Sequence, residues 1–291
     1  MKQIVFVSGK GGTGKSTIVA SLSLLVKNKM LADCDVDAPN LHLLIPGEQI
    51  QKKDYFGART AQIDPAVCVN CGMCKQVCRF DAIGDDYTID PMACEGCAAC
   101  RVLCPSDAIS IISVKSGETY VTKTERGVLS YGRLTIGAEG SGKLVTEVRR
   151  NLFEFMQGED WVLIDGSPGI GCVVIASITG TDAVVAVAEP TQSGQHDLDR
   201  VLSVADHFRV PAYVCINKYD LNEEITRFIE IKCQERCVPI IGRIPYEPAI
   251  VQALQKNMTP VEANIQSVVE PIQNLWRNLS DEMKSGIYIP F

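Results

Sequence analysis

Five short runs of apolar residues are spaced along the chain, each about as long as a buried strand. They are Ile4 to Val7, Met30 to Cys34, Trp161 to Asp165, Ala183 to Ala188 and Ala212 to Ile216. A continuous apolar run without alternation is typical of a strand that is covered on both faces, as strands of parallel sheets are. These runs therefore predict the strands of one largely parallel sheet.

Segments with the helical spacing of apolar residues lie between these strands. We expect helices at residues 16–29, 143–156, 173–178, 196–208, 247–256 and 263–284. Two further short strands are expected within 120–136, with a turn at Arg126 and Gly127. Strands that alternate with helices predict an α/β fold, a mostly parallel doubly wound sheet with helices on both faces.

A glycine-rich loop joins the first predicted strand to the first predicted helix. Gly9, Gly14, Lys15 and Ser16 match G-x-x-x-x-G-K-[ST] in the strand–loop–helix context that a phosphate-binding loop requires. Backbone N–H groups of such a loop surround phosphate oxygens, Lys15 would reach the β- and γ-phosphates, and the Ser16 hydroxyl would bind Mg²⁺. The residues that we expect to contact a nucleotide here are Gly9, Gly11, Gly12, Thr13, Gly14, Lys15, Ser16 and Thr17.

Lys10 directly follows the first glycine of this loop, which reads K-G-G-T-G-K-S-T. The loop resembles the deviant Walker A motif of the MinD/Mrp/ParA ATPases and of the nitrogenase iron protein. The resemblance implies that Lys10 reaches the phosphates of a facing subunit in a dimer that holds ATP between its subunits. It also implies ATP and Mg²⁺ as cofactors, a homodimer or a heterodimer of paralogues, and catalytic roles for Lys10 and Lys15.

Carboxylates stand at the ends of two predicted strands. One strand ends in D-C-D-V-D, with Asp33, Asp35 and Asp37 at alternate positions, and W-V-L-I-D ends in Asp165. Acidic side chains close to a phosphate loop need a cationic partner, and Mg²⁺ with its waters is the natural one. The same resemblance implies that Asp35 orients the attacking water, Asp37 belongs to the mobile segment and Asp165 holds the Mg²⁺ shell.

The segment Asn217 to Asp220, N-K-Y-D, follows another buried strand and concerns the choice of base. It resembles the N-K-x-D motif that recognises guanine in GTPases. In the MinD/Mrp class, however, an asparagine at this place reads adenine, and a later segment like Ile244-Pro245 packs on the base. We prefer ATP, and we expect Asn217, Ile244 and Pro245 at the base.

The chain changes character from about residue 58 to residue 116, where cysteines recur at regular spacing. Two runs share the spacing C-x2-C-x2-C-x3-C with an offset of 26 residues, and Asp81-Ala82-Ile83 echoes Asp107-Ala108-Ile109. The runs are Cys68, Cys71, Cys74 and Cys78, and Cys94, Cys97, Cys100 and Cys104. In a chain without secretory features, such runs point to metal ligation before disulfides.

This double run resembles a bacterial-type ferredoxin with two [4Fe–4S] clusters. In that arrangement the fourth cysteine of each run serves the other cluster. The resemblance implies one cluster on Cys68, Cys71, Cys74 and Cys104 and a second on Cys78, Cys94, Cys97 and Cys100. One departure is Arg79, which stands where Pro105 follows the second run. Zinc and a disulfide framework are the alternatives, since zinc ribbons also use C-x2-C pairs.

Three other cysteines bear on a metal at a subunit interface. Cys172 lies seven residues after Asp165, the spacing at which the nitrogenase iron protein has a ligand of a [4Fe–4S] cluster shared between subunits. Cys172 is thus a candidate ligand of a bridging cluster, with a small buried residue at a helix start as the favoured alternative. Cys233 and Cys237 are expected on one face of a helix, but their spacing differs from the C-x-x-C pair of Mrp-type carriers, which argues against ligation.

Composition and charge exclude several kinds of partner. The chain has 291 residues and a net charge of −7, so no basic surface for nucleic acid is expected. Charged residues, proline and glycines interrupt the apolar stretch 161–188, and the stretch 273–291 is not a basic amphipathic anchor, so no membrane contact is expected. The first strand begins at residue 3 or 4, which leaves no room for a secretion signal, and we expect a cytoplasmic protein.

These patterns divide the chain into a discontinuous P-loop ATPase domain, 1–57 and 117–291, and an inserted small α+β ferredoxin-like domain, 58–116. The resemblances imply an ATPase in which nucleotide-driven dimer changes gate electron transfer through two clusters to a redox partner. The alternative is an Mrp-like ATPase that assembles or carries clusters for an acceptor protein. Less favoured are an amidoligase like cobyrinate a,c-diamide synthase, which would need a glutaminase domain, and a MinD-like positioning ATPase, which would need a membrane tail.

Overall fold

The computed structural model describes residues 1–138 and 141–285, which form two compact units. Unit 1 contains Met1–Lys52, Tyr120–Gly132 and the chain from Ser141 onwards. Unit 2 contains Lys53–Thr119 and the segment that starts at Arg133.

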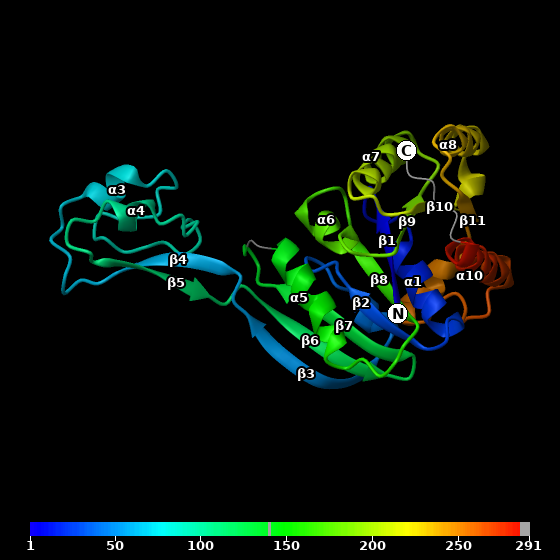
Figure 1. Cartoon of the computed structure of the whole chain (residues 1–291), viewed down its shortest axis with the longest axis horizontal. Coiled ribbons are helices and arrows are strands. Elements are labelled where there is room, and N and C mark those ends of the chain that lie inside the picture. Colours follow the sequence, from blue (N-terminus) through cyan, green and yellow to red (C-terminus); the bar gives the residue numbers. More distant parts are fainter. Residues whose placement is uncertain (139–140, 286–291) are drawn as a thin grey trace. The chain divides into compact units, whose positions relative to one another are not determined.

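Unit 1 is built on a nine-stranded sheet with the order β11-β10-β9-β1-β8-β2-β7-β6-β3 (Figure 1). Its strands are β1 (Lys2–Ser8), β2 (Lys29–Asp33), β3 (Gly47–Tyr55), β6 (Gly117–Thr124), β7 (Gly127–Leu134), β8 (Trp161–Pro168), β9 (Ala183–Ala188), β10 (Ala212–Asn217) and β11 (Ile240–Ile244). Every neighbouring pair from β11 to β7 is parallel. The predicted α/β fold with a mostly parallel central sheet is therefore confirmed.

The central strand β1 is covered on both faces. Successive side chains of a strand point to opposite faces, yet Ile4 and Val5 are both fully buried. Ile4 lies in register with Leu163 of β8 and Ala183 of β9, so apolar side chains line up across the sheet. Burial from both sides explains why these strands read as continuous apolar runs.

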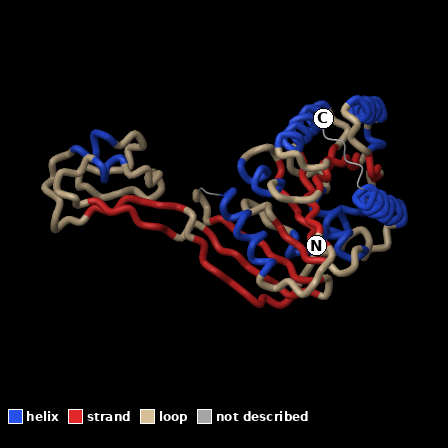
Figure 2. The backbone as a smooth tube through the Cα atoms, viewed as in Figure 1, coloured by secondary structure: helices blue, strands red, loops and turns tan. Residues whose placement is uncertain are grey.

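Helices cover both faces of this sheet (Figures 1 and 2). They are α1 (Lys15–Leu25), α2 (Leu41–Leu44), α5 (Ser141–Phe153), α6 (Cys172–Ile178), α7 (Gln192–His207), α8 (Glu223–Glu235), α9 (Ala249–Gln255) and α10 (Gln266–Ser285), with a 3₁₀ turn at Tyr219–Leu221. α1 and α10 contact each other and share one apolar core with the sheet. α5, α6 and α7 pack on the opposite face.

Unit 2 contains a two-stranded antiparallel sheet and two short helices (Figure 2). β4 (Ala58–Ile63) pairs with β5 (Ile109–Val114), and α3 (Met73–Val77) and α4 (Ala99–Val102) lie between them in the sequence. Its core consists of Ala61, Cys74, Ile83, Cys100 and Ile109, and the partly buried residues packed against it include Cys78, Cys94 and Cys104. The core of this unit is thus built largely around its thiols.

The internal repeat of unit 2 is visible in its backbone. Three pairs of residues, each offset by 26 positions, adopt positive φ angles between 50° and 77°. These pairs are Asn70 and Gly96, Gly72 and Ala98, and Asp81 and Asp107. The two cysteine runs therefore follow the same local path, including its left-handed turns.

The end of α8 differs from the sequence expectation. The helix ends at Glu235 with Cys233 buried inside it, whereas Cys237 lies beyond the end, has a φ of 52° and is exposed. The N–H of Val238 donates to the Cys233 carbonyl at 2.8 Å, a bond that closes a helix C-terminus. The prediction that the two cysteines share one helical face is wrong.

The long strand β3 was also absent from the sequence-based prediction. Its sequence, G-E-Q-I-Q-K-K-D-Y, has no apolar run, and its residues are exposed or half-buried at the edge of the sheet. No helix in the described part of the chain combines the length and the apolar character needed to cross a membrane. Residues 286–291 of the C-terminal stretch lie outside the described residues.

Candidate functional site

The glycine-rich loop leaves β1 and turns directly into α1. Gly14 has a φ of 84° and precedes Lys15, the first residue of the helix, and a Cβ at Gly14 would lie 2.4 Å from Nδ2 of Asn217. Gly9 packs so closely on α7 that an added Cβ would lie 1.9 Å from Cβ of Asp197. Only glycine can be accommodated at these two close contacts. The backbone N–H groups of the loop lie at the N-terminus of α1, and helix N-termini bind anions.

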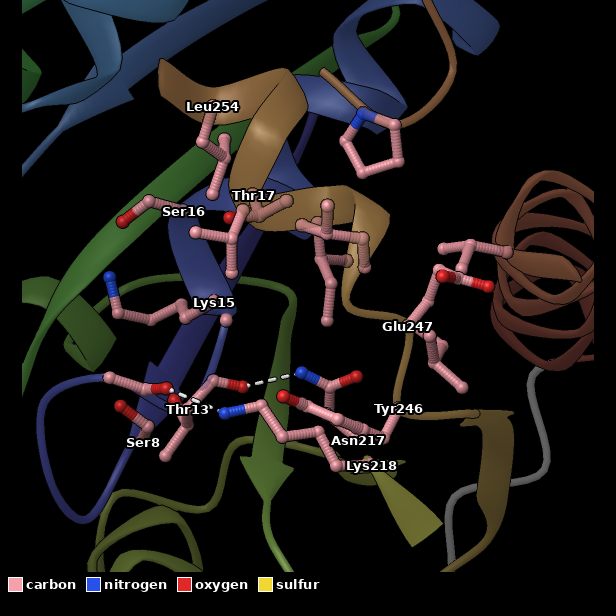
Figure 3. Close-up of a pocket in the computed structure, with 18 of the residues that line it drawn as sticks. Ser8, Thr13, Lys15, Ser16, Thr17, Asn217, Lys218, Tyr246, Glu247 and Leu254 are labelled. Atoms are coloured by element: carbon pink, nitrogen blue, oxygen red, sulfur yellow. Dashed lines mark hydrogen bonds between the residues drawn. The ribbon is translucent and has the colours of Figure 1, made fainter. Parts of the chain in front are cut away.

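A cavity of about 380 Å³ lies beside this loop (Figure 3). The loop and the start of α1 form one side, and the segment after β11 with α9 and α10 forms another. The predicted site residues that line it are Gly11, Gly12, Thr13, Gly14, Lys15, Ser16, Thr17, Asp35, Asn217, Ile244 and Pro245. A volume of this order suits a small-molecule ligand.

Two side chains at the end of β10, those of Asn217 and Lys218, tie that strand to the loop (Figure 3). Asn217 donates from Nδ2 to the carbonyl oxygen of Thr13 at 2.7 Å, and this bond is buried. Lys218 donates from Nζ to the carbonyl oxygen of Gly12 at 3.2 Å. Both residues therefore position the loop as well as lining the cavity.

Asp220, the last residue of N-K-Y-D, does not line the cavity. Its Oδ1 accepts a hydrogen bond from the backbone N–H of Tyr246 at 2.7 Å. Tyr246 belongs to the segment after β11 that forms the cavity wall. Asp220 therefore holds this wall in place through the backbone.

Lys15 and Asp165 form a buried ion pair. Their side chains are 5% and 0% exposed, and Lys15 donates from Nζ to Oδ1 of Asp165. Oδ2 of Asp165 is buried and has no hydrogen-bond partner among the described residues. A buried carboxylate oxygen is costly without a partner, so this oxygen could accept from a water of a hydrated Mg²⁺. The Ser16 hydroxyl, which lines the cavity, is the second candidate ligand.

Asp33 organises the segment that follows β2. Its carboxylate accepts hydrogen bonds from the backbone N–H groups of Asp35, Asn40 and Leu41 at 2.9 to 3.0 Å. Complete burial, and then the carboxylate of Asp165 beside it, raise the pKa of Asp33 to about 7. Two acidic groups this close together call for a shared proton or cation.

The remaining predicted residues around the phosphate end are placed differently. Asp35 is half-buried and lines the cavity, and burial raises the pKa of its carboxyl group. Asp37 is exposed and does not line the cavity.

Lys10 is held by side chains that follow β9. Its Nζ donates to Oγ1 of Thr191 at 3.1 Å and to Oγ of Ser193 at 3.4 Å, and it lies 3.5 Å from Oε2 of Glu189. Glu189 also pairs with Lys218. One carboxylate thus bridges two lysines at the edge of the loop.

The eight cysteines of the two runs line two small cavities in unit 2, four in each. One cavity is lined by Cys68, Cys71, Cys74 and Cys104, and the other by Cys78, Cys94, Cys97 and Cys100. Each cavity takes three cysteines from one run and the fourth from the other. All eight are free thiols.

Backbone amides donate to two of these sulfurs. Ala61 N–H donates to Sγ of Cys94 at 3.4 Å, and Ala108 N–H donates to Sγ of Cys104 at 3.3 Å. Burial would raise the pKa of both thiols, but a neighbouring threonine or serine hydroxyl and the backbone amides outweigh it, so both pKa values are lowered. A lowered pKa favours the thiolate, the form that binds metal.

Cys172 is the first residue of α6 and is exposed. The expectation of a small buried residue at this helix start is therefore wrong. The exposed thiol lies in unit 1, separate in sequence from the two four-cysteine sets.

Comparison with known proteins places this geometry in a family. The family described as CobQ/CobB/MinD/ParA nucleotide binding domain matches residues 4–261. The chain belongs to this family. The family description names a nucleotide-binding domain, which agrees with the cavity beside the glycine-rich loop.

Two uncharacterized proteins of Methanocaldococcus jannaschii are similar to this family member over nearly its whole length. MJ0578 is 32% identical over 283 residues, which covers 96% of each chain. MJ0579 is 26% identical over 281 residues, which covers 94% of this chain and 97% of the relative. Because both matches cover at least 94% of this chain, they must include most of the cysteine-rich segment. Both relatives come from one organism, which therefore has two paralogues of this kind.

Among solved structures, the septum site-determining protein MinD of Pyrococcus horikoshii OT3, complexed with Mg-ADP, is similar to this chain. The TM-score is 0.57 at 18% identity, and the match covers 100% of this chain and 99% of that chain. At this identity the likeness shows a shared P-loop NTPase fold. ATP and Mg²⁺ are consistent with membership of this family.

Sequence reasoning missed part of the cavity and the partners of Lys10. The missed lining residues include Glu247, Ile250, Val251, Leu254, Val268 and Ile272. Their spacing by three or four residues indicated helices, but it could not show that one edge of those helices faces a ligand rather than the core. Glu189 carried no sequence signal, because its pairing with Lys10 depends on the neighbouring strands β1 and β9.

Proposed function

We propose that this protein is an ATP-binding and ATP-hydrolysing iron–sulfur protein in which nucleotide-driven dimer changes gate electron transfer through two [4Fe–4S] clusters to a partner protein. The observation that carries the proposal is the combination, in one chain, of a phosphate-loop cavity and two cavities each lined by four thiols. A γ-phosphate can order a segment that relaxes on hydrolysis, which is how such loops act on partners.

The contacts of Asp220 support ATP over GTP. In a guanine site of the N-K-x-D type, the aspartate carboxylate must accept hydrogen bonds from the base. Here Asp220 accepts from the Tyr246 backbone instead and lies outside the cavity lining. Asn217 and the apolar wall of Ile244 and Pro245 would then contact adenine.

The arrangement of thiols supports iron–sulfur clusters over zinc. A zinc ion would draw its sulfurs to about 2.3 Å from one point. The described side chains include no group of three or more ligands that could hold a single ion. Four thiols spread around a cavity suit a cluster with one iron behind each sulfur.

The proposal assigns roles to the residues that line or border the nucleotide cavity. They are Lys15 for the phosphates, Ser16 and Asp165 for Mg²⁺, Asp35 and Asp37 for the attacking water and its mobile segment, and Lys10 for a facing subunit. Two paralogues in one organism support a homodimer or a heterodimer of this kind. The exposure of Cys172 supports its assignment as a ligand at the dimer interface.

Anaerobic purification followed by metal analysis tests the proposal. We expect about eight irons and eight sulfides per chain, and an EPR spectrum of the reduced protein that changes on addition of ATP and Mg²⁺. Cys71→Ser and Cys97→Ser, one in each set, should each lower the iron content by about half. Lys15→Ala should keep the iron but abolish the response to ATP. Zinc in place of iron would contradict the proposal.

Cluster delivery is the second candidate, and one observation favours it. Each four-cysteine set contains one exposed thiol, Cys71 in the first and Cys97 in the second, and an exposed ligand eases release. Incubation with an apo-ferredoxin acceptor separates the two functions. Iron that moves to the acceptor in an ATP-dependent manner would favour delivery, whereas retained iron supports electron transfer.

The family name itself covers CobQ, CobB, MinD and ParA proteins. An amidoligase activity would appear as glutamine-dependent turnover of ATP. A MinD-like positioning activity, which the shared fold allows, would appear as ATP-dependent co-sedimentation with liposomes. We expect neither, because the eight thiols of unit 2 have no role in those activities.

A further inference from the structure

Four side chains form a continuous stack across one edge of the unit 1 sheet. The ring of Tyr131 in β7 lies parallel to that of His42 in α2, with centroids 4.6 Å apart and an interplanar angle of 7°. On its other side it stacks on Tyr120 of β6, with centroids 4.9 Å apart at 12°. Nζ of Lys52 in β3 lies 5.4 Å from the Tyr120 ring centroid. We call these four residues the aromatic ladder.

One part of the ladder lies in the strand next to Asp33, the buried carboxylate beside Asp165. Tyr131 is the register partner of Asp33 in the neighbouring strand, and Asp33 is in turn the register partner of Asp165. Only the strand β2, which carries Asp33, therefore separates Tyr131 from Asp165, the carboxylate proposed to serve Mg²⁺.

The His42 end of the ladder is tied to the segment 35–40, which we call the switch segment. Asp33 accepts hydrogen bonds from the N–H groups at both ends of this segment, those of Asp35 and of Asn40 and Leu41. Leu41 is the first residue of α2, and His42 follows it. A movement of the switch segment that breaks the hydrogen bonds of Asn40 and Leu41 would therefore reach His42, the ring at the end of the ladder.

The other end of the ladder lies at two of the places where the chain passes between the units. The chain leaves unit 1 after Lys52 and re-enters it at Tyr120. Lys52 is exposed in the edge strand β3, and Tyr120 is half-buried in the neighbouring strand β6 (Figure 1). Any strain in these strands is carried covalently into the cysteine-rich unit.

We propose that the aromatic ladder couples the position of the switch segment to the strands β3 and β6, and through them to unit 2. Stacked rings have preferred offsets and angles, so a shift of His42 is passed on through Tyr131 to Tyr120. The proposal rests on the proposed function in one respect, namely that the nucleotide moves the switch segment. If ATP shifts the conformational equilibrium of unit 2 by some factor, linkage requires that the two states of unit 2 differ in their affinity for ATP by that same factor.

Hydrogen exchange on the full chain tests the coupling directly. We expect a non-hydrolysable ATP analogue with Mg²⁺ to slow exchange about fivefold or more in 47–55 and 117–124, relative to ADP. Tyr131→Leu should abolish this difference, whereas Tyr131→Phe, which keeps the ring, should preserve it. All variants are measured at a saturating concentration of the analogue, so that loss of the exchange difference cannot come from weaker binding; Tyr131 itself does not line the cavity.

Two further variants keep the test decisive. Trp276→Leu removes an aromatic partner of Trp161 elsewhere in unit 1, where the rings meet edge to face at 5.0 Å, and should leave the exchange difference intact. His42→Ala removes only the end ring of the ladder and should act like Tyr131→Leu, so the test survives if the latter does not fold.

The outcomes separate this proposal from the proposed function. If the exchange difference persists in Tyr131→Leu and His42→Ala, the ladder does not carry the coupling. The same conclusion follows if the parent protein with bound nucleotide shows no exchange difference. A difference that depends on Tyr131 without any nucleotide effect on the EPR spectrum supports the ladder and contradicts gated electron transfer.

Discussion

At the scale of single residues, both lysines of the glycine-rich loop lie against carboxylates. Lys15 pairs with the buried Asp165, and Lys10 lies near Glu189, which is only 12% exposed. A triphosphate would compete with these carboxylates for the same two cations. The carboxylates therefore set how readily each lysine turns to a phosphate.

The Glu189→Gln variant tests this competition. We expect the dissociation constant of the dimer, measured by sedimentation with a non-hydrolysable ATP analogue, to fall by about two- to fivefold, because a partly exposed ion pair contributes about 0.2–1 kcal/mol. The reason is that Lys10 is released for the facing phosphates. Glu235→Gln, which removes the 3.1 Å pair with Lys232 on α8, is the matched control and should change nothing. A weaker dimer for Glu189→Gln would contradict the proposed role of Lys10.

At the scale of elements, the two halves of the repeat in unit 2 have equivalent turns, but different residue types occupy the equivalent positions. Gly72 and Ala98 occupy equivalent left-handed positions, with φ angles of 77° and 66°, and each precedes a short helix. A left-handed alanine costs about 1–2 kcal/mol, whereas glycine adopts this conformation freely. Gly96, by contrast, has no space for a side chain, since a Cβ would lie 2.5 Å from the carbonyl oxygen of Arg59.

Two substitutions in the cysteine-rich repeat of unit 2 should differ in their effect on the iron content. Ala98→Gly should keep the full iron content and leave stability unchanged or raised by up to about 1 kcal/mol, the left-handed cost less the entropy cost of glycine. Gly96→Ala should lose about half of the iron, because the added Cβ displaces the chain between Cys94 and Cys97. Iron analysis and thermal unfolding measure both. Equal iron in the two variants would show that the backbone path does not control loading.

At the scale of the whole molecule, the two units are stabilised in different ways. Unit 1 has a large core between its sheet and helices, with residues such as Phe6, Leu163 and Leu275 fully buried. Among the described residues, the apolar cluster of unit 2 has five buried members, and two of them, Cys74 and Cys100, are proposed cluster ligands. Small units with little apolar core are commonly stabilised by a bound metal or by cross-links.

Iron removal should therefore unfold unit 2 alone. We expect two calorimetric transitions in the loaded protein, and we expect chelation under reducing conditions to remove the one that belongs to unit 2. Saturation with ATP and Mg²⁺ at 100 times the dissociation constant should stabilise unit 1 by about 2.7 kcal/mol. Proteolysis confined to the segment 53–119 after chelation would confirm the assignment. A single transition that chelation leaves unchanged would contradict it.

The sequence alone carried most of the local chemistry. Local patterns of residues were sufficient to predict the phosphate loop and the buried strands. The spacing of the two cysteine runs likewise predicted which thiols belong together. The parallel sheet followed from the same signals, because burial on both faces leaves a continuous apolar run. The edge strand β3 escaped prediction, since a largely exposed strand carries no such run.

Only the tertiary structure decided which distant residues meet. The pairing of Lys15 with Asp165 joins residues 150 positions apart, and that of Lys10 with Glu189 depends on β1 lying beside β9. The stack of His42, Tyr131 and Tyr120 likewise depends on strand order. Motifs are local and can be read from spacing, whereas these contacts are set by the order and register of strands, which depend on how the whole core packs.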